Sequence, residues 1–363
     1  MAMNCVIHQI ESFRAKLNRI IQMIKDSVLI IGAGGSAHLG YPTAATLMGT
    51  LKVWGLGKSV YLEPRNLGLA TRSSGMFHYG IYNLWPMENI PCYQEFVKQL
   101  SKQSTAKNID AFLRDNIDHR ETGKLLIAAE ILSKENVTHA STPSWLSLII
   151  QEFLECSSSE DILSNEMGII SFNYDVSPEY YFYEHLKNTP RVCEYADAFC
   201  AQLQENMVHV YGAVRTGTFN EIHSTYGTAL GNSRDKDYET TYLLSTADKS
   251  EIKVIYGDKQ DEVSVMPHII KAKKLLAGAK RIFVLGFGFD RQNVALLGLK
   301  QLSGKLVYYT NQDPRSDFKE IVESSFGSNN NFKAYQKIED ALATIGSDYV
   351  DSGFSTPGHL HVV

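Results

Sequence analysis

Two polar residues at the end of an apolar run have the types and the spacing for chemistry on a sugar. The segment "MGIISFNYD" ends in Asn173 and Asp175, two residues apart. On an extended strand end both side chains point the same way, so a carboxamide stands beside a carboxylate. Such a pair can orient a water molecule and stabilise a developing positive charge, as a sugar C1 atom requires when it loses a good leaving group. A turn, or a cap on the next helix, is the alternative role.

A histidine and a tyrosine in the segment "MVHVYGAV" form a second candidate pair. His209 and Tyr211 alternate with apolar residues on one predicted strand, so both are expected to face the same cleft. Only an imidazole accepts a proton readily near neutral pH, which makes His209 the candidate proton acceptor. A purely structural histidine is the alternative.

A glycine-rich turn follows the first predicted strand, at residues 28–31. Gly32, Gly34 and Ala37 fit the pattern G-x-G-x-x-A, a form of the fingerprint that binds dinucleotide phosphates. Glu63, at the end of a possible second strand, could hold a ribose. A tight turn without any ligand is the alternative for this pattern.

The chain after these glycines departs from a standard dehydrogenase. There the helix begins at the glycines and its first turn faces the pyrophosphate. Here Gly40-Tyr41-Pro42 intervene, and the residue before a proline is biased away from helix. We therefore expect a loop, able to cover a ligand, before a helix that starts at Pro42 or Thr43.

Strands and helices alternate along most of the chain, which favours an α/β fold built on a Rossmann-like, doubly wound parallel sheet. The expected strands include "RIFVLGFGFD", "KLVYYTNQD" and "EIKVIY", and a helix is expected over "PHIIKAKKLLAGA". Ligands of such sheets bind at the carboxyl ends of the strands, which adds Gly286, Gly288 and Asn311 to the candidate site.

Three further segments complete the predicted organisation. An amphipathic helix occupies residues 1–25, a mostly helical insertion covers about 65–165, and a tail follows at 351–363. Helical spacing within the insertion predicts helices at 93–102, 108–116, 122–134 and 143–155. A last helix is expected near 337–345.

Composition limits the function classes that are open to this chain. It has 363 residues, is 44% hydrophobic and carries a formal net charge of −5. That balance gives no electrostatic footprint for nucleic acid or an anionic membrane. We recognise no signal peptide and no long apolar span, which indicates a cytoplasmic protein. The five cysteines are scattered, so we expect reduced thiols and neither a disulfide framework nor a metal site.

Five segments, in their order and spacing, resemble the SIR2-like, or sirtuin-related, domain family of prokaryotic antiviral defence systems. The resemblance covers about residues 27–312 and is carried by "VLIIGAGGSAHLGYPTAATL", "NIDAFLRDN", "IISFNYD", "VHVYGAV" and "RIFVLGFGFDRQNVALLGL". It implies an NAD-binding domain over 26–350. It also implies hydrolysis of the nicotinamide–ribose bond of NAD+, consumed as a substrate rather than held as a cofactor, so that NAD is depleted in an infected cell.

The resemblance also implies roles for single residues. Asn173 matches the essential asparagine of the family and Asp175 the acid of its Asn-x-Asp motif. The phosphate and ribose region of NAD would be lined by Gly32, Ala33, Gly34 and Ser36, and the adenosine half by Gly286 and Gly288.

Two departures from the family pattern matter. The paired cysteines of the zinc module that protein deacylases carry are missing, so deacylation is not expected. The sirtuin histidine immediately precedes a glycine, but here Tyr211 precedes Gly212 and His209 lies two residues earlier. Either residue is therefore a candidate for that role.

Assembly and alternative functions stay open on the sequence. The opening helix and the insertion supply more apolar faces than one sheet needs, which favours a homo-oligomer, and members of the family are linked with separately encoded ATPase or Argonaute-type partners. Two other functions compete: a module that senses NAD or ADP-ribose without cutting it, and an NAD-dependent oxidoreductase.

Overall fold

The computed structural model describes residues 26–54, 93–103, 109–137, 145–146, 149–150, 167–229, 236–253, 259–310 and 317–335. Several predictions concern residues outside these ranges: the N-terminal helix, the strand ending at Glu63, the candidate ligand residue Asn311, the helix near 337–345 and the tail at 351–363.

Six parallel strands form one sheet in the described part of the chain, which confirms the predicted Rossmann-like α/β class. Their order is β3-β2-β1-β4-β5-β6. In such a sheet ligands bind where the strand order reverses, here between β1 and β4. The strands are β1 (Ser27–Ile31), β2 (Gly168–Ser171), β3 (Met207–His209), β4 (Arg281–Leu285), β5 (Leu306–Thr310) and β6 (Asn331–Tyr335).

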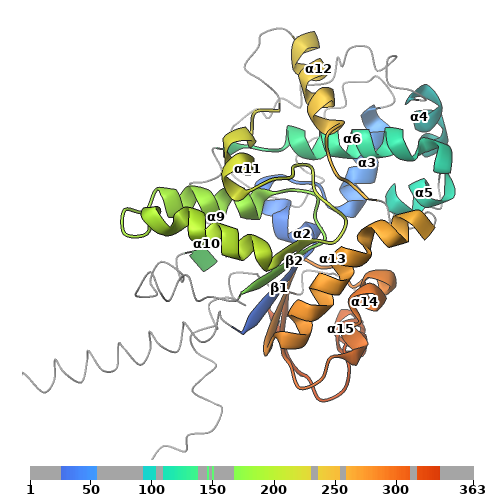
Figure 1. Cartoon of the computed structure of the whole chain (residues 1–363). Coiled ribbons are helices and arrows are strands. Elements are labelled where there is room, and N and C mark those ends of the chain that lie inside the picture. The colour runs from blue at the N-terminus through green and yellow to red at the C-terminus, as the bar shows by residue number, and fades with distance from the viewer. Residues whose placement is uncertain are drawn as a thin grey trace, which may run out of the picture.

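Helices cover both faces of the sheet, because the side chains of each strand alternate between them. In β1, Leu29 and Ile31 belong to one hydrophobic cluster, and Val28 and Ile30 to the other. Figure 1 shows α9 (Ser177–Lys187) and α10 (Ala196–Glu205) on one side of the sheet. On the other side lie α13 (Lys259–Gly278), α14 (Arg291–Leu297) and α15 (Phe318–Ser325). The sheet is doubly wound, as predicted.

The described part of the insertion is helical. It contains α4 (Tyr93–Lys102), α5 (Ile109–Asp115) and α6 (Arg120–Ser133), at the places where helical spacing predicted them. These helices gather beside α3 (Ala44–Trp54), with α12 (Lys236–Ala247) against α6. Of the predicted helix at 143–155, only 145–146 and 149–150 are described, and they are helical.

The loop predicted before the helix is present at residues 40–43, but it does not follow the glycine turn directly. A short helix, α2 (Ala33–Ser36), begins directly at the glycines and continues as a 3-10 turn, η1 (Ala37–Leu39). The helical path breaks at Gly40, whose φ of 86° is left-handed. The expected break before Pro42 is therefore present, and α3 starts at Ala44.

Two other predicted boundaries differ from the structure. The helix expected to start at Pro267 begins at Lys259, and Pro267 lies inside it. A proline there deprives the carbonyl of Val263 of its donor, and Val263 is exposed, so water can replace the bond. Residues 251–253 of the expected strand "EIKVIY" lie outside the sheet. The amides of Glu251 and Lys253 donate to the carbonyls of Ala213 and Tyr211, beyond the end of β3.

A buried ion pair fastens the insertion to the rest of the domain. Glu135, just after α6, accepts two hydrogen bonds of 2.7 Å from the guanidinium of Arg215, and one of 2.9 Å from the amide of Gly227. The Glu135 side chain is fully buried and that of Arg215 is 9% exposed. These bonds fix the end of α6 to both ends of the segment that carries α11 (Phe219–Thr225).

We predict that Glu135→Ala lowers the free energy of unfolding by about 3–5 kcal/mol, because it leaves a buried guanidinium without its partner. Chemical denaturation measures the change. As a control, Lys98→Ala removes an exposed ion pair with Glu95 and should cost less than about 1 kcal/mol. Equal losses of unfolding free energy in the two variants would contradict the stabilising role of the Glu135–Arg215 ion pair.

Candidate functional site

Two glycine turns touch each other at the point where the strand order reverses. The amide of Gly32, after β1, donates to the carbonyl of Leu285 at 3.0 Å, and that of Gly34 to the carbonyl of Gly286 at 3.1 Å. A Cβ on Gly32 would lie 2.6 Å from the carbonyl oxygen of Gly286, and one on Gly286 would lie 2.1 Å from the amide nitrogen of Gly35. Glycine is thus required here by the contact between backbones.

A cavity of about 730 Å³ opens beside these turns, a size typical of sites for small-molecule ligands. Most of the predicted site residues line it. They are Gly32, Ala33, Gly34, Ser36, Asn173, Asp175, Tyr211, Gly286 and Gly288. The insertion contributes Ile109, Asp110 and Ile131 to the wall, which gives this segment a place at the site.

One hydroxyl joins the two polar residues that follow β2. The Nδ2 amide of Asn173 donates to Oγ of Ser36 at 2.9 Å, and Ser36 is also hydrogen-bonded to Asp175. Asn173 is 7% exposed, and its Oδ1 has no hydrogen-bond partner. The site therefore contains a buried acceptor that lacks a donor, a condition that costs about 1–3 kcal/mol and that a ligand hydroxyl or a water molecule would relieve.

Asp175 also has the turn role that its position in the sequence allowed. Its Oδ1 accepts hydrogen bonds from the amide and the hydroxyl of Ser177, the first residue of α9. Burial raises the pKa of this carboxyl, while the hydrogen bonds from Ser177 and Ser36 act against that rise. Asp175 is thus a rigid acid, held between the helix start and the cavity.

His209 does not line the cavity, so the expectation that it shares a cleft with Tyr211 is wrong. The strand ends at His209, and the chain then turns. Its Nδ1 lies 2.9 Å from the carbonyl oxygen of Asn173, and its Nε2 lies 2.7 Å from a carboxylate oxygen of Glu179. Both neighbours are acceptors, so both ring nitrogens donate and the ring is cationic.

The electrostatics of His209 agree with this geometry. Burial by itself lowers the pKa of the imidazole, but the Glu179 carboxylate and the bonds to Glu179 and Asn173 outweigh burial and raise the pKa to about 9. A ring that is already protonated at neutral pH cannot accept a proton. His209 instead anchors the backbone of Asn173.

Tyr211 takes the place on the cavity wall. Its hydroxyl donates to Oδ1 of Asn293 on α14. Its ring meets that of Phe172 edge-on, with centroids 5.5 Å apart, and Phe172 in turn contacts Phe287 at 4.8 Å. Tyr211, which precedes Gly212, therefore forms an aromatic wall of the site.

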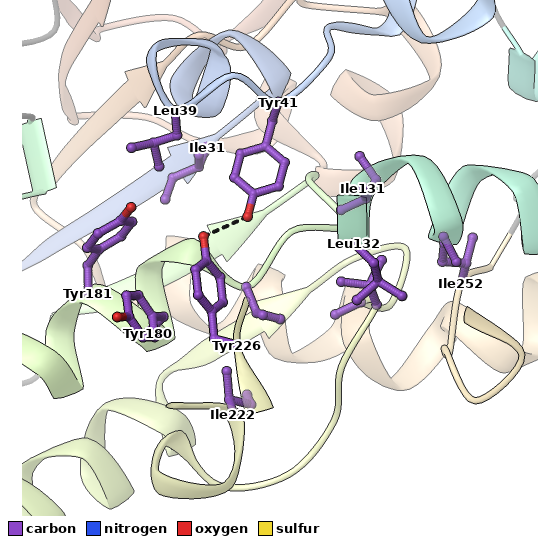
Figure 2. Packing of buried hydrophobic residues seen from close by; sticks show 14 of the residues in the cluster. Ile31, Leu39, Tyr41, Ile131, Leu132, Tyr180, Tyr181, Ile222, Tyr226 and Ile252 are labelled. Atoms are coloured by element: carbon purple, nitrogen blue, oxygen red, sulfur yellow. Dashed lines mark hydrogen bonds between the residues drawn. The ribbon is translucent and has the colours of Figure 1, made fainter. Parts of the chain in front are cut away.

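The loop between α2 and α3 closes another side of the cavity. Tyr41, Pro42 and Thr43 line it, as the loop prediction anticipated. Figure 2 shows the hydroxyl of Tyr41 against that of Tyr226, 2.7 Å away, and Tyr226 stacks on Tyr180 with ring centroids 4.0 Å apart. This tyrosine cluster fixes the loop.

Sequence reasoning missed several lining residues that lie within the quoted motifs. Asp110 belongs to "NIDAFLRDN", and Asp290 and Asn293 belong to "GFGFDRQN". Thr310 lies at the end of β5, where its hydroxyl accepts a bond of 3.0 Å from the amide of Gly286. The rule that ligands meet strand ends could have found Thr310 and Asp290, but nothing local marks Asp110, which comes from the insertion.

Charge in the cavity has one sign. Its lining includes Asp110, Asp175 and Asp290, and none of the described lining residues is Lys, Arg or His. Within the described ranges, no group of three or more His, Cys, Asp or Glu side chains is arranged to hold a metal ion. No helix among the described residues has the length and apolarity to cross a membrane.

Comparisons of the chain with protein-family models, with curated proteins and with solved structures found no significant match.

We predict that His209 makes stability fall with rising pH. Its pKa is about 9 in the folded protein, against an ordinary value of 6.5, so the folded protein holds an extra proton between these limits. Its contribution, about 3 kcal/mol, is complete below pH 6.5 and is lost as the pH rises through 9. Chemical denaturation at pH 6.5 and at pH 9 measures the loss of unfolding free energy between the two. This loss should be smaller for His209→Gln than for the wild type. Equal losses would contradict the buried imidazolium.

Proposed function

We propose that the protein is an NAD+ glycohydrolase, which cleaves the nicotinamide–ribose bond with water to give nicotinamide and ADP-ribose. The observation that carries this proposal is Asn173, a buried side chain on the cavity wall whose Oδ1 has no donor. The bond to Ser36 fixes its amide, and the bond from His209 fixes its backbone carbonyl. A ribose hydroxyl or the attacking water is the donor that this acceptor fits.

The position of the cavity supports a dinucleotide ligand. It lies where the strand order reverses, between β1 and β4, the usual place for nucleotides in open α/β sheets. The diphosphate would lie along the backbone of the glycine turns, where no side chain is in the way. The cavity lining contains carboxylates, and its described residues include no cationic side chain. This charge suits the pyridinium end of NAD+ and disfavours an additional phosphate on the ribose.

The chemistry asked of the side chains is modest. The leaving group is a cationic pyridinium, so no general acid is needed, and departure leaves positive charge on the ribose. Asp175, held by Ser36 and Ser177, contributes a fixed negative charge near that centre. Asn173 positions the ribose or the water, and Tyr211 forms an aromatic wall of the pocket. Positioning and electrostatics supply most of the rate.

A second candidate function is a sensor that binds NAD+ or ADP-ribose without cutting it. One observation favours it: His209, the expected proton acceptor, is cationic and lies outside the cavity wall. Nicotinamide release separates the two functions, because a sensor binds the ligand and releases none.

The cellular setting belongs to the same proposal and rests on the resemblance to the sirtuin-related family. Hydrolysis of a soluble metabolite in the cytoplasm would deplete NAD during an antiviral response. Control would come from self-assembly or from a separately encoded ATPase or Argonaute-type partner.

We predict that Asn173→Ala abolishes hydrolysis while the protein stays folded. Loss of the oriented carboxamide should lower nicotinamide release about 100-fold or more, and loss of one hydrogen bond to Ser36 should cost only about 1 kcal/mol of stability. Chromatography of the products and thermal unfolding measure the two effects.

Asn188→Ala is the matched control, because Asn188 is exposed at the end of α9 and should leave the rate unchanged. A folded Asn173→Ala protein that retains more than about a tenth of the wild-type rate would contradict the role given to Asn173.

A further inference from the structure

One carboxylate of the insertion reaches the cavity beside the residues that follow β2. Asp110 lies in the first turn of α5, is half-buried and lines the cavity. The hydroxyl of Tyr174 donates to its Oδ1 at 3.4 Å. Tyr174 directly follows Asn173 in the chain, so this contact ties Asp110 to the segment that carries the asparagine.

The other two carboxylates on the described lining have structural tasks. Asp175 accepts hydrogen bonds from Ser177 and from Ser36. Asp290 is exposed and caps α14, since its Oδ1 accepts a bond of 2.9 Å from the amide of Gln292. The side-chain hydrogen bond that Asp110 accepts, from Tyr174, is long. His209 is not an alternative proton acceptor, because its ring is already protonated.

We propose that Asp110 is the catalytic base of the site and accepts the proton of the attacking water. This inference rests on the proposed NAD+ hydrolysis. The water oxygen forms a bond to C1′ of the ribose, and the C1′–N bond breaks with its electron pair going to the pyridine nitrogen. Nicotinamide leaves neutral, ADP-ribose keeps the new hydroxyl, and the proton passes to Asp110 and then to solvent.

The protonation state of Asp110 suits this task. Burial raises the pKa of its carboxyl to about 6; the bonds from Tyr174 and from the backbone act against the rise, and the charge of Asp290 adds to it. On the helices packed against α5, Lys52 binds the carbonyl of Gln103, Arg120 binds that of Leu113, and Glu130 pairs with Lys134. The buried ring of His119 stacks on Phe112 of α5, with centroids 6.4 Å apart. Asp110 is therefore ionised at neutral pH, with a pKa close enough to it for efficient proton transfer.

The test compares Asp110→Asn with Asp115→Asn, which changes an exposed carboxylate of the same helix that pairs with Arg114. We expect Asp110→Asn to lower kcat about 100-fold or more with little change in NAD+ affinity measured by calorimetry, and Asp115→Asn to match the wild type. The wild-type rate should fall as the pH drops below about 6, and Asp110→Asn should lack this acid limb.

A second variant makes the test specific to the ionisation of Asp110. Tyr174→Phe removes a bond that lowers the pKa of Asp110, so the acid limb should move to higher pH. A folded Asp110→Asn protein that keeps the wild-type rate and acid limb would overturn the role of Asp110 and leave the proposed function standing. So would one that loses NAD+ binding and not kcat. A wild-type protein that releases no nicotinamide would overturn both this inference and the proposed function.

Discussion

The site depends on the contact between two glycine turns, one after β1 and one after β4. The amide of Gly34 binds the carbonyl of Gly286, and no Cβ fits between the two backbones. Because the strand order reverses between these strands, the helices that follow them diverge to opposite faces of the sheet. The cavity lies beside the contact, so its shape follows from the approach of these two turns.

A chain of polar contacts orients the side chains around this cavity. Ser36 links the end of the glycine turn to both Asn173 and Asp175. His209 donates to the backbone carbonyl of Asn173, and Glu179 accepts from the other ring nitrogen of His209. The asparagine is thus fixed through its amide and its backbone, while its Oδ1 is left without a partner. Fixed groups of this kind need little reorganisation when charge develops, which is the source of electrostatic catalysis.

Local patterns in the sequence predicted the framework because burial dictates them. Parallel strands buried on both faces are runs of aliphatic residues, and Ile30 and Ile31 are completely buried. The glycines and the Asn173–Asp175 pair were found because strand ends of such a sheet meet at one edge. The extension of α13 before Pro267 was missed because a proline usually marks a helix start, yet an exposed helix face tolerates one inside.

The residues that sequence reasoning misplaced depend on long-range contacts. The partner of His209 is Glu179, 30 residues away, and no local pattern shows that the imidazole meets two acceptors. Asp110 lines the cavity from the insertion, which the Glu135–Arg215 pair and the apolar faces of α5 and α6 join to the rest of the domain. Side-chain identity alone therefore favoured His209 as the base, and the three-dimensional contacts favour Asp110.

The most direct test of this account is to incubate the pure wild-type protein with NAD+ and to separate the products by chromatography over time. We predict that nicotinamide and ADP-ribose appear in equal amounts as NAD+ disappears, without formation of reduced NAD. NAD+ that is bound by the protein and recovered intact, alone and with candidate partners present, would contradict it.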